Sequence, residues 1–117
     1  MAVAARELVA CDVEKISERD SCWKDLLGSE RYRLCELISQ SSGDSRDVAA
    51  TRVWTAVECL KKAAAPANAP LMLSSNGLEG WVIFSSGRLL IGTFFAEMTN
   101  SSPMIFAILL KNRLSKV

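Results

Sequence analysis

The segment LEGWVIFSSGRLLIGTFF, residues 78 to 95, decides the predicted fold. It holds two apolar runs, Trp81 to Phe84 and Leu89 to Phe95, separated by the sequence Ser85-Ser86-Gly87-Arg88. Short runs rich in β-branched and aromatic residues on either side of a glycine-containing turn are typical of an antiparallel hairpin. Because Arg88 interrupts the hydrophobicity, the segment does not suit a membrane-spanning helix. The sequence therefore predicts an antiparallel sheet centred on residues 80 to 97.

Both sides of the second predicted strand are apolar. Alternation puts Leu89, Ile91, Thr93 and Phe95 on one side and Leu90, Gly92, Phe94 and Ala96 on the other. A strand with one side in water alternates apolar with polar residues, so this strand is expected to be covered on both sides. We expect the protein's own helices to cover one side.

The second side, or an unpaired apolar edge, is predicted to bind a protein partner, because large bare apolar patches are rare on monomers. The alternation does not say which side is which, so the predicted interface includes residues of both sets. Its residues are Trp81, Ile83, Leu89, Leu90, Ile91, Phe94, Phe95, Ile105 and Phe106.

The first half of the chain is predicted to be helical. Apolar residues recur at helical spacing from Ala4 to Ile16, with charged residues between them. A short helix or turn is expected over 17 to 27, ended by Gly28, and a helix over 30 to 40 with Ser29 as its N-cap. A third long helix, over 45 to 64, has capping residues before it and two lysines in its last turn.

The end of the chain allows two interpretations. Seven successive apolar residues, Met104 to Leu110, suit a buried strand. Ser102-Pro103 before them, and cations after them, suit the start and end of a helix over 103 to 116, which is the preferred interpretation. Residues 71 to 73 are predicted as an edge strand, followed by a tight turn at Asn76-Gly77.

The predicted fold class is therefore α+β: N-terminal helices, then a small antiparallel sheet of two to four strands, then a C-terminal helix or strand. The chain has 117 residues, half of them hydrophobic, which suits a single domain over 1–117. Within it, 1–65 is the helical part, 66–77 a linker and turn, and 78–117 the hairpin plus the C-terminal element. A formal net charge of +1 provides no overall field for nucleic acid or an acidic membrane.

The inventory of reactive side chains indicates a protein that is not an enzyme. The chain contains no histidine, which excludes Ser-His-Asp triads and Cys-His pairs. Its four cysteines form no CxxC pair, so they match no common zinc site and are interpreted as reduced, partly buried thiols; no metal or cofactor is predicted. The serine pair Ser85-Ser86 near Arg88 is interpreted as part of a turn rather than as a nucleophile.

Two short stretches resemble known modules. Gly87-Arg88-x-x-x-Gly92 resembles the Gly-Arg-x-x-x-Gly hairpin of Sm-like RNA-binding proteins. Residues 76 to 92, followed by 102 to 116, resemble the hairpin-then-helix opening of roadblock or longin modules, which implies a protein-binding scaffold.

The function predicted from the sequence is a non-catalytic protein-interaction or scaffold subunit of an intracellular complex, forming homo- or hetero-oligomers. The N-terminus reaches charged residues at Arg6 and Glu7 before any long apolar stretch, so a cytoplasmic or nuclear location is expected. The alternative is a small nucleic-acid-binding accessory protein that uses Arg88, Lys111, Arg113 and Lys116.

Overall fold

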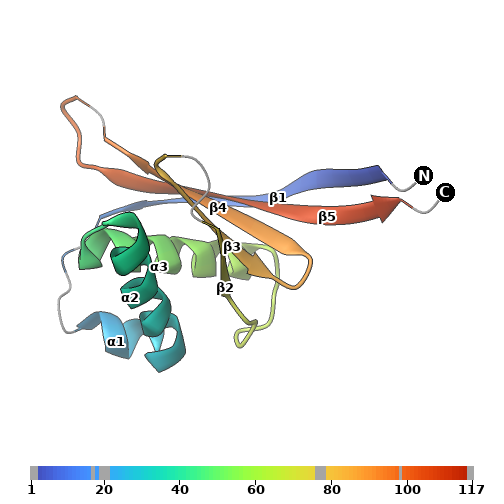
Figure 1. Cartoon of the computed structure of the whole chain (residues 1–117). Helices are drawn as coiled ribbons and strands as arrows, with labels where there is room; N and C mark the ends of the chain where they lie inside the picture. Colours follow the sequence, from blue (N-terminus) through green and yellow to red (C-terminus); the bar gives the residue numbers. More distant parts are fainter. Residues whose placement is uncertain (1–2, 17, 19–21, 76–78, 98, 116–117) are drawn as a thin grey trace.

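The computed structural model describes residues 3–16, 18, 22–75, 79–97 and 99–115, and of 3–6, 75 and 112–115 it describes the backbone alone. The elements of this part of the chain are β1 (Val3–Lys15), α1 (Cys22–Leu27), α2 (Ser29–Ser42), α3 (Arg46–Lys62), β2 (Met72–Ser75), β3 (Trp81–Ser86), β4 (Leu89–Ala96) and β5 (Met104–Ser115). The described strands form one antiparallel sheet in the order β1-β5-β4-β3-β2. Figure 1 shows the described helices together on one side of this sheet and both termini at the end of the β1–β5 ribbon. The α+β class is therefore confirmed.

The predicted helix-first order is wrong, because the chain begins with strand β1 instead of a helix over 4 to 16. β1 pairs along its length with β5, from Val3 opposite Ser115 to Lys15 opposite Met104. A register shift between Leu8 and Ala10 marks a bulge, which reverses the alternation partway along the strand. This bulge lets residues at helical spacing serve as a strand, and pairing with β5 supplies the backbone hydrogen bonds that a helix would have made internally.

The preference for a C-terminal helix is also wrong, and the strand interpretation is confirmed, because 104–115 form β5. β5 lies between β1 and β4 and is hydrogen-bonded on both edges. Its residues Ile105, Ala107 and Leu109 are buried on the helix side, while Phe106 and Ile108 between them point the other way. Successive residues of a strand point to opposite sides, and both sides of β5 are apolar here. This explains the unbroken apolar run from Met104 to Leu110.

The central hairpin and the two longer helices are confirmed. β3 and β4 pair from Trp81 opposite Phe94 to Ser86 opposite Leu89, and Gly87 adopts a left-handed backbone (φ 60°) in the turn. The hydroxyl of Ser45 accepts a hydrogen bond from the backbone N–H of Val48 and caps α3. Helix α2 begins at Ser29, but its N-cap is Gly28 and no side chain caps it.

Three smaller expectations have mixed outcomes. A short helix, α1, lies within the region 17 to 27, and β2 is the predicted edge strand. The sheet of two to four strands is wrong: the described residues form five, because both ends of the chain joined it. The turn predicted at Asn76-Gly77 lies outside the described residues.

The core lies between α3 and the helix side of the sheet. Arg52 of α3 is buried there with 2% of its surface exposed. Its Nε donates to Asp44 Oδ2 at 2.7 Å, and its Nη1 donates to the carbonyl oxygens of Thr93 at 2.8 Å and Gly80 at 3.1 Å. This buried guanidinium ties the helix layer to β4 and to the turn before β3. The largest fully buried apolar side chains of the described residues are Trp23, Phe84, Ile38, Ile91, Ile105, Leu109, Val53 and Val82.

Candidate functional site

The side of the sheet that faces away from the helices, here called the open face, is almost entirely apolar. Residues that are directly paired across neighbouring strands point to the same side, so the register assigns the open face row by row. One row is Trp81, Phe94, Phe106 and Val13; the next is Ile83, Gly92, Ile108 and Cys11; the third is Ser85, Leu90, Leu110 and Leu8. Among these twelve residues only Ser85 carries a polar side chain.

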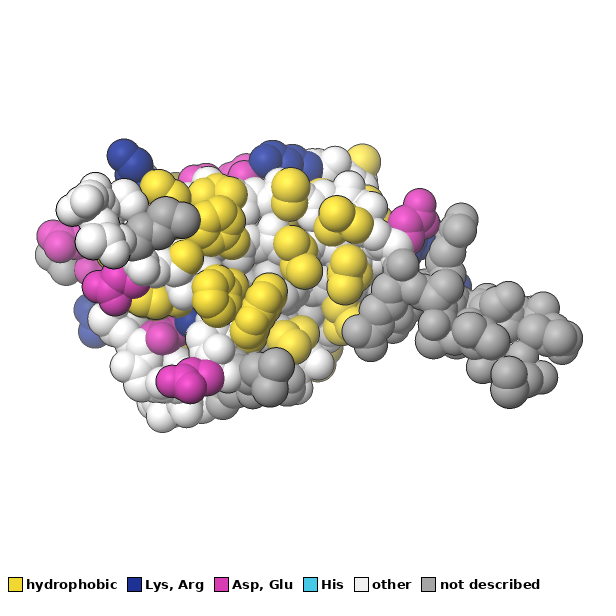
Figure 2. Space-filling view, turned by 90° about the horizontal axis from the view of Figure 1, so that it is seen from above, with side chains coloured by type: hydrophobic (Ala, Val, Ile, Leu, Met, Phe, Trp, Pro, Cys, Tyr) yellow, Lys and Arg dark blue, Asp and Glu magenta, His cyan; other side chains and the backbone are white. Residues whose placement is uncertain are grey.

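Figure 2 views the molecule from the side of the open face and shows hydrophobic side chains gathered over its centre, with charged side chains around the margin. The central residues shield one another and are half-buried, whereas Leu8, Val13 and Met72 are 62%, 47% and 64% exposed. No described helix covers them (Figure 1). Water is therefore in contact with a continuous apolar surface on this side of the sheet.

The size of the open face follows from sheet geometry. From Met104 to Leu110 the strand rises about 3.3 Å per residue, or about 20 Å in all, and four strands spaced about 4.8 Å apart are about 19 Å wide. The projected area is then about 400 Å², which is within the range of the largest apolar patches on monomers, and patches of that rank are often functional.

The two largest rings of the open face sit next to its glycine. The centroids of Trp81 and Phe94 are 5.2 Å apart with their planes tilted by 43°. A Cβ placed on Gly92 would lie 2.9 Å from Cζ3 of Trp81. The indole therefore leans over Gly92 and fills the space that a side chain would have used, so this part of the open face is level rather than hollow.

The two edges of the sheet are less suited to binding than the open face. At the β1 edge, Lys62 Nζ donates to the carbonyl oxygen of Cys11 at 3.1 Å and to Asp12 Oδ1 at 2.8 Å, which places a cation against the strand's unpaired backbone. The other edge strand, β2, has four residues and a register shift. Edge lysines, short strands and irregular pairing all discourage the addition of a further strand.

The structure divides the nine predicted interface residues between the two sides of the sheet. Trp81, Ile83, Leu90, Phe94 and Phe106 lie on the open face. The register puts the other four on the helix side, so they are withdrawn from the candidate surface; they are Leu89, Ile91, Phe95 and Ile105. Ile91 and Ile105 are 0% exposed and could not reach a partner in the folded protein.

Sequence reasoning missed the part of the open face that β1 contributes, and the central residue Ile108 of β5. Both omissions follow from interpreting the ends of the chain as helices. A signal was present: from Cys11 to Glu14 apolar and acidic residues alternate, as they do in a strand with different surroundings on its two sides. The residues added by the structure are Leu8, Cys11, Val13, Met72, Met104, Ile108 and Leu110.

The four free thiols occupy different environments. Cys11 and Cys22 are exposed, whereas Cys35 and Cys59 are buried. Burial raises the pKa of the Cys35 thiol to about 12 and, with help from nearby Asp12, that of the Cys59 thiol to about 12. The buried pair therefore stays protonated and unreactive. Cys11 is the thiol that reports on the open face.

The serines weighed as possible nucleophiles are separated by the sheet. Ser85 lies on the open face beside Leu90, while Ser86 is 8% exposed on the helix side. Among the described residues, neither hydroxyl is hydrogen-bonded to a side chain that could act as a base. The arrangement offers no nucleophile–base pair of the kind that acyl transfer uses.

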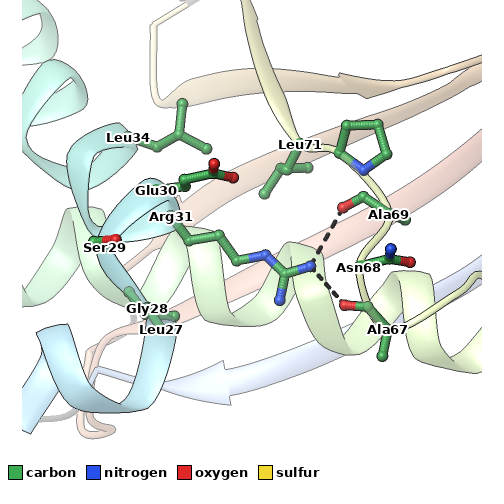
Figure 3. Close-up of a pocket in the computed structure, with 11 residues that line it drawn as sticks. Leu27, Gly28, Ser29, Glu30, Arg31, Leu34, Ala67, Asn68, Ala69 and Leu71 are labelled. Atoms are coloured by element: carbon green, nitrogen blue, oxygen red, sulfur yellow. Dashed lines mark hydrogen bonds between the residues drawn. The ribbon is translucent and has the colours of Figure 1, made fainter.

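A pocket of about 420 Å³ lies between the start of α2 and the segment that follows α3 (Figure 3). The guanidinium of Arg31 points across it, and Nη2 donates to the carbonyl oxygens of Ala67 at 3.1 Å and Ala69 at 3.3 Å. These bonds hold the segment after α3 against α2. These hydrogen bonds of Arg31 therefore have a structural role. The pocket lies in the helix layer, on the other side of the sheet from the open face.

The described structure places two basic residues of the nucleic-acid alternative, Arg88 and Lys111, near one another, because Leu89, which follows Arg88, pairs directly with Lys111. Arg88 is exposed in the β3–β4 turn, and Lys111 is exposed on β5 with Glu7 directly opposite on β1. The side chain of Arg113 and the whole of Lys116 lie outside the described part of the chain. An acidic neighbour beside one of the two placed cations weakens an electrostatic site for phosphate.

Comparison with protein-family models, with curated proteins and with solved structures finds no match to this chain. Among the helices of the described residues, none has the length and apolar character needed to cross a membrane.

Proposed function

We propose that the protein is a non-catalytic interaction or scaffold subunit of an intracellular complex and that it binds its protein partner through the open face. The observation that carries the proposal is an apolar sheet face of about 400 Å², built from four strands and left uncovered by the described helices. Covering such a surface releases water from apolar side chains, at about 25 cal/mol per Å² removed from solvent.

Further support comes from the composition of the open face. Trp81, Phe94 and Phe106 lie in one row across three strands. Aromatic side chains are enriched at the centres of protein interfaces, and charged residues are depleted there. The absence of histidine from the sequence and the separation of Ser85 from Ser86 support a role in binding rather than catalysis.

A photo-crosslinking amino acid tests the proposal. Benzoylphenylalanine in place of Phe106 puts the probe on the open face, and the same residue in place of Leu37 is the control, because Leu37 is an apolar side chain 42% exposed on α2. We expect irradiation of cells to produce discrete covalent protein adducts from position 106 and none from position 37. If position 106 gives no adduct, or both positions give the same ones, the open face is not a protein-binding surface.

A further inference from the structure

We infer that Lys62 makes an autoinhibitory contact: its ammonium group occupies the free edge of β1 and prevents that edge from pairing with β1 of a second copy. The inference concerns the edge of the sheet and does not rest on the open face or its partner. β1 has 13 residues, and its outer edge has no neighbouring strand among the described residues. A long unpaired edge is a template for edge-to-edge association, so a sheet that ends in one needs a feature that blocks it.

The hydrogen-bond pattern shows which backbone groups of β1 point away from the sheet. The N–H of Ile16 donates to the carbonyl oxygen of Pro103 at 3.2 Å, which marks a hydrogen-bonded pair next to the end of the ladder. In an antiparallel ladder, hydrogen-bonded pairs alternate with pairs whose backbone groups point away from the partner strand. The register is unbroken over this part of β1, so Cys11, Val13 and Lys15 turn both their N–H and their carbonyl oxygen toward the free edge.

These outward groups would allow two copies of β1 to pair about a two-fold axis at Val13. Val13 would then pair with its own counterpart, and Cys11 with Lys15 of the second copy. Three such pairs, with two bonds each, give about six backbone hydrogen bonds. The bulge between Leu8 and Ala10 limits the regular edge to this stretch, so the carbonyl oxygen of Cys11 is an acceptor that the pairing requires.

Lys62 already occupies this acceptor. It is the last residue of α3, and its Nζ donates to the carbonyl oxygen of Cys11 at 3.1 Å and to Asp12 Oδ1 at 2.8 Å. The side chain therefore reaches from the helix layer to the outer edge of β1. A strand that arrived at this edge would have to displace an ammonium group from its carboxylate, and lysines at edge strands oppose association in this way.

Asp12 holds Lys62 in place at a cost in stability. The Asp12 side chain is 10% exposed, and its Oδ2 atom is buried with no hydrogen-bond partner in the described part of the chain. A buried acceptor that is left unpaired destabilises a fold. The hydrogen bond to Asp12 raises the pKa of the Lys62 ammonium above its ordinary value of 10.5, so the cation persists throughout the neutral range. The contact that this carboxylate supports is the one that closes the edge.

The acidic side chains of β1 oppose the same pairing. Both Asp12 and Glu14 point to the helix side of the sheet, because their partners on β5 are buried there. In the pairing centred on Val13, Asp12 would lie directly opposite Glu14 of the second copy. Like charges directly opposite one another on paired strands are destabilising. A cation on the backbone and two carboxylates on one side therefore act together against pairing of this edge.

The neighbouring Lys61 provides a matched control. Its side chain is 57% exposed and that of Lys62 is 55% exposed, so the two lysines differ little in accessibility. Lys61 Nζ lies 3.2 Å from Glu58 Oε1 and 5.3 Å from the centroid of the Trp54 ring, and both contacts stay within α3. Lys61→Met and Lys62→Met therefore remove the same charge from the same turn of the helix, and only Lys62→Met uncovers the edge.

Sedimentation over about 1 to 300 μM, a range that detects micromolar association, compares these variants with wild type. We expect Lys62→Met to strengthen self-association at least about tenfold and Lys61→Met to change it by less than about twofold, since only the first frees backbone groups for a second strand. Association through the open face would be common to all three proteins, so the difference between them is the measure. Lys62→Met that behaves like wild type, or like Lys61→Met, overturns the inference.

Lys62→Met leaves the buried carboxylate of Asp12 without its partner, so a second variant separates association from loss of folding. Asp12→Asn/Lys62→Met removes the cation and the carboxylate together, and it also removes the repulsion from Glu14 of a second copy. We expect this double variant to keep the wild-type circular dichroism and to associate at least as strongly as Lys62→Met. A folded double variant that associates no more than wild type overturns the inference.

Amide hydrogen exchange locates the contact on the sheet. The N–H groups of Val13 and Lys15 point to the free edge and should exchange rapidly in wild type. In the double variant their exchange should slow at least about tenfold between the lowest and the highest concentration, whereas the exchange of α2 amides should not change. Association without this protection of Val13 and Lys15 shows that another surface is used, and it overturns the inference.

Discussion

Replacing Arg52 with methionine should sharply destabilise the fold, because this guanidinium joins three parts of the molecule. Arg52 is 2% exposed and reaches Asp44 at 2.7 Å, the Thr93 carbonyl oxygen at 2.8 Å and the Gly80 carbonyl oxygen at 3.1 Å. Methionine is similar in length and apolar, so the substitution removes the charge and the donors with little change in volume. It leaves a carboxylate that is largely buried and two carbonyl oxygens without these donors.

The magnitude follows from the loss of one member of a buried ion pair, which costs about 3 to 5 kcal/mol. Removal of the arginine also relieves its own desolvation cost, so we expect the net loss of unfolding free energy to be about 3 to 4 kcal/mol. With an unfolding entropy of about 2.1 cal/mol/K per residue, a chain of 117 residues has about 250 cal/mol/K, and the Tm falls by about 12 to 16 °C.

Chemical denaturation, with calorimetry alongside, measures this loss. The matched control is Arg52→Met/Asp44→Asn, in which the carboxylate that lost its partner becomes a neutral amide. We expect the double variant to recover about 1 to 2 kcal/mol of the single variant's loss. A loss below about 1 kcal/mol for Arg52→Met would refute the reasoning, because the buried network would then contribute no more than an exposed pair.

The remaining predictions concern the open face, the thiols and an acidic side chain. Gly92→Ala puts a Cβ 2.9 Å from Trp81 Cζ3 and should turn the indole outward, costing about 1 to 2 kcal/mol of stability by denaturation; unchanged stability would contradict this. A thiol reagent should react rapidly with Cys11 and Cys22 in dilute native protein, while Cys35 and Cys59, whose pKa values burial raises to about 12, should react only on unfolding; four fast thiols would show that the core is open. Burial and the neighbouring carboxylate of Asp12 raise the pKa of Glu14 above its ordinary value of 4.5. The contribution of Glu14 to folding stability is therefore present at low pH and is lost as the pH rises through the folded-state pKa. Glu14→Gln should therefore stabilise the protein at pH 7, and the difference in stability between variant and wild type should disappear when it is measured below pH 4.5.

The parts of the fold that the sequence predicted correctly are those specified by local signals. Gly87 in a turn between two apolar runs is enough to indicate the β3–β4 hairpin, because the paired strands are separated by two residues. Ser45 before α3 and the two lysines at its end act within one helical turn of the residues they stabilise. The sequence also showed that both sides of β4 are apolar, and from this it predicted that the second side of the strand is covered.

Tertiary structure alone decided what the two ends of the chain become. Val3 pairs with Ser115 and Lys15 with Met104, so the partner that makes β1 a strand lies about ninety to a hundred and ten residues away, and no local periodicity reports it. The same pairing decided the candidate site. Since the side-chain period of a strand is two, the sequence could show that Ile91 and Leu90 point in opposite directions. Only the position of α3 against the sheet decided that Ile91 belongs to the core and Leu90 to the open face.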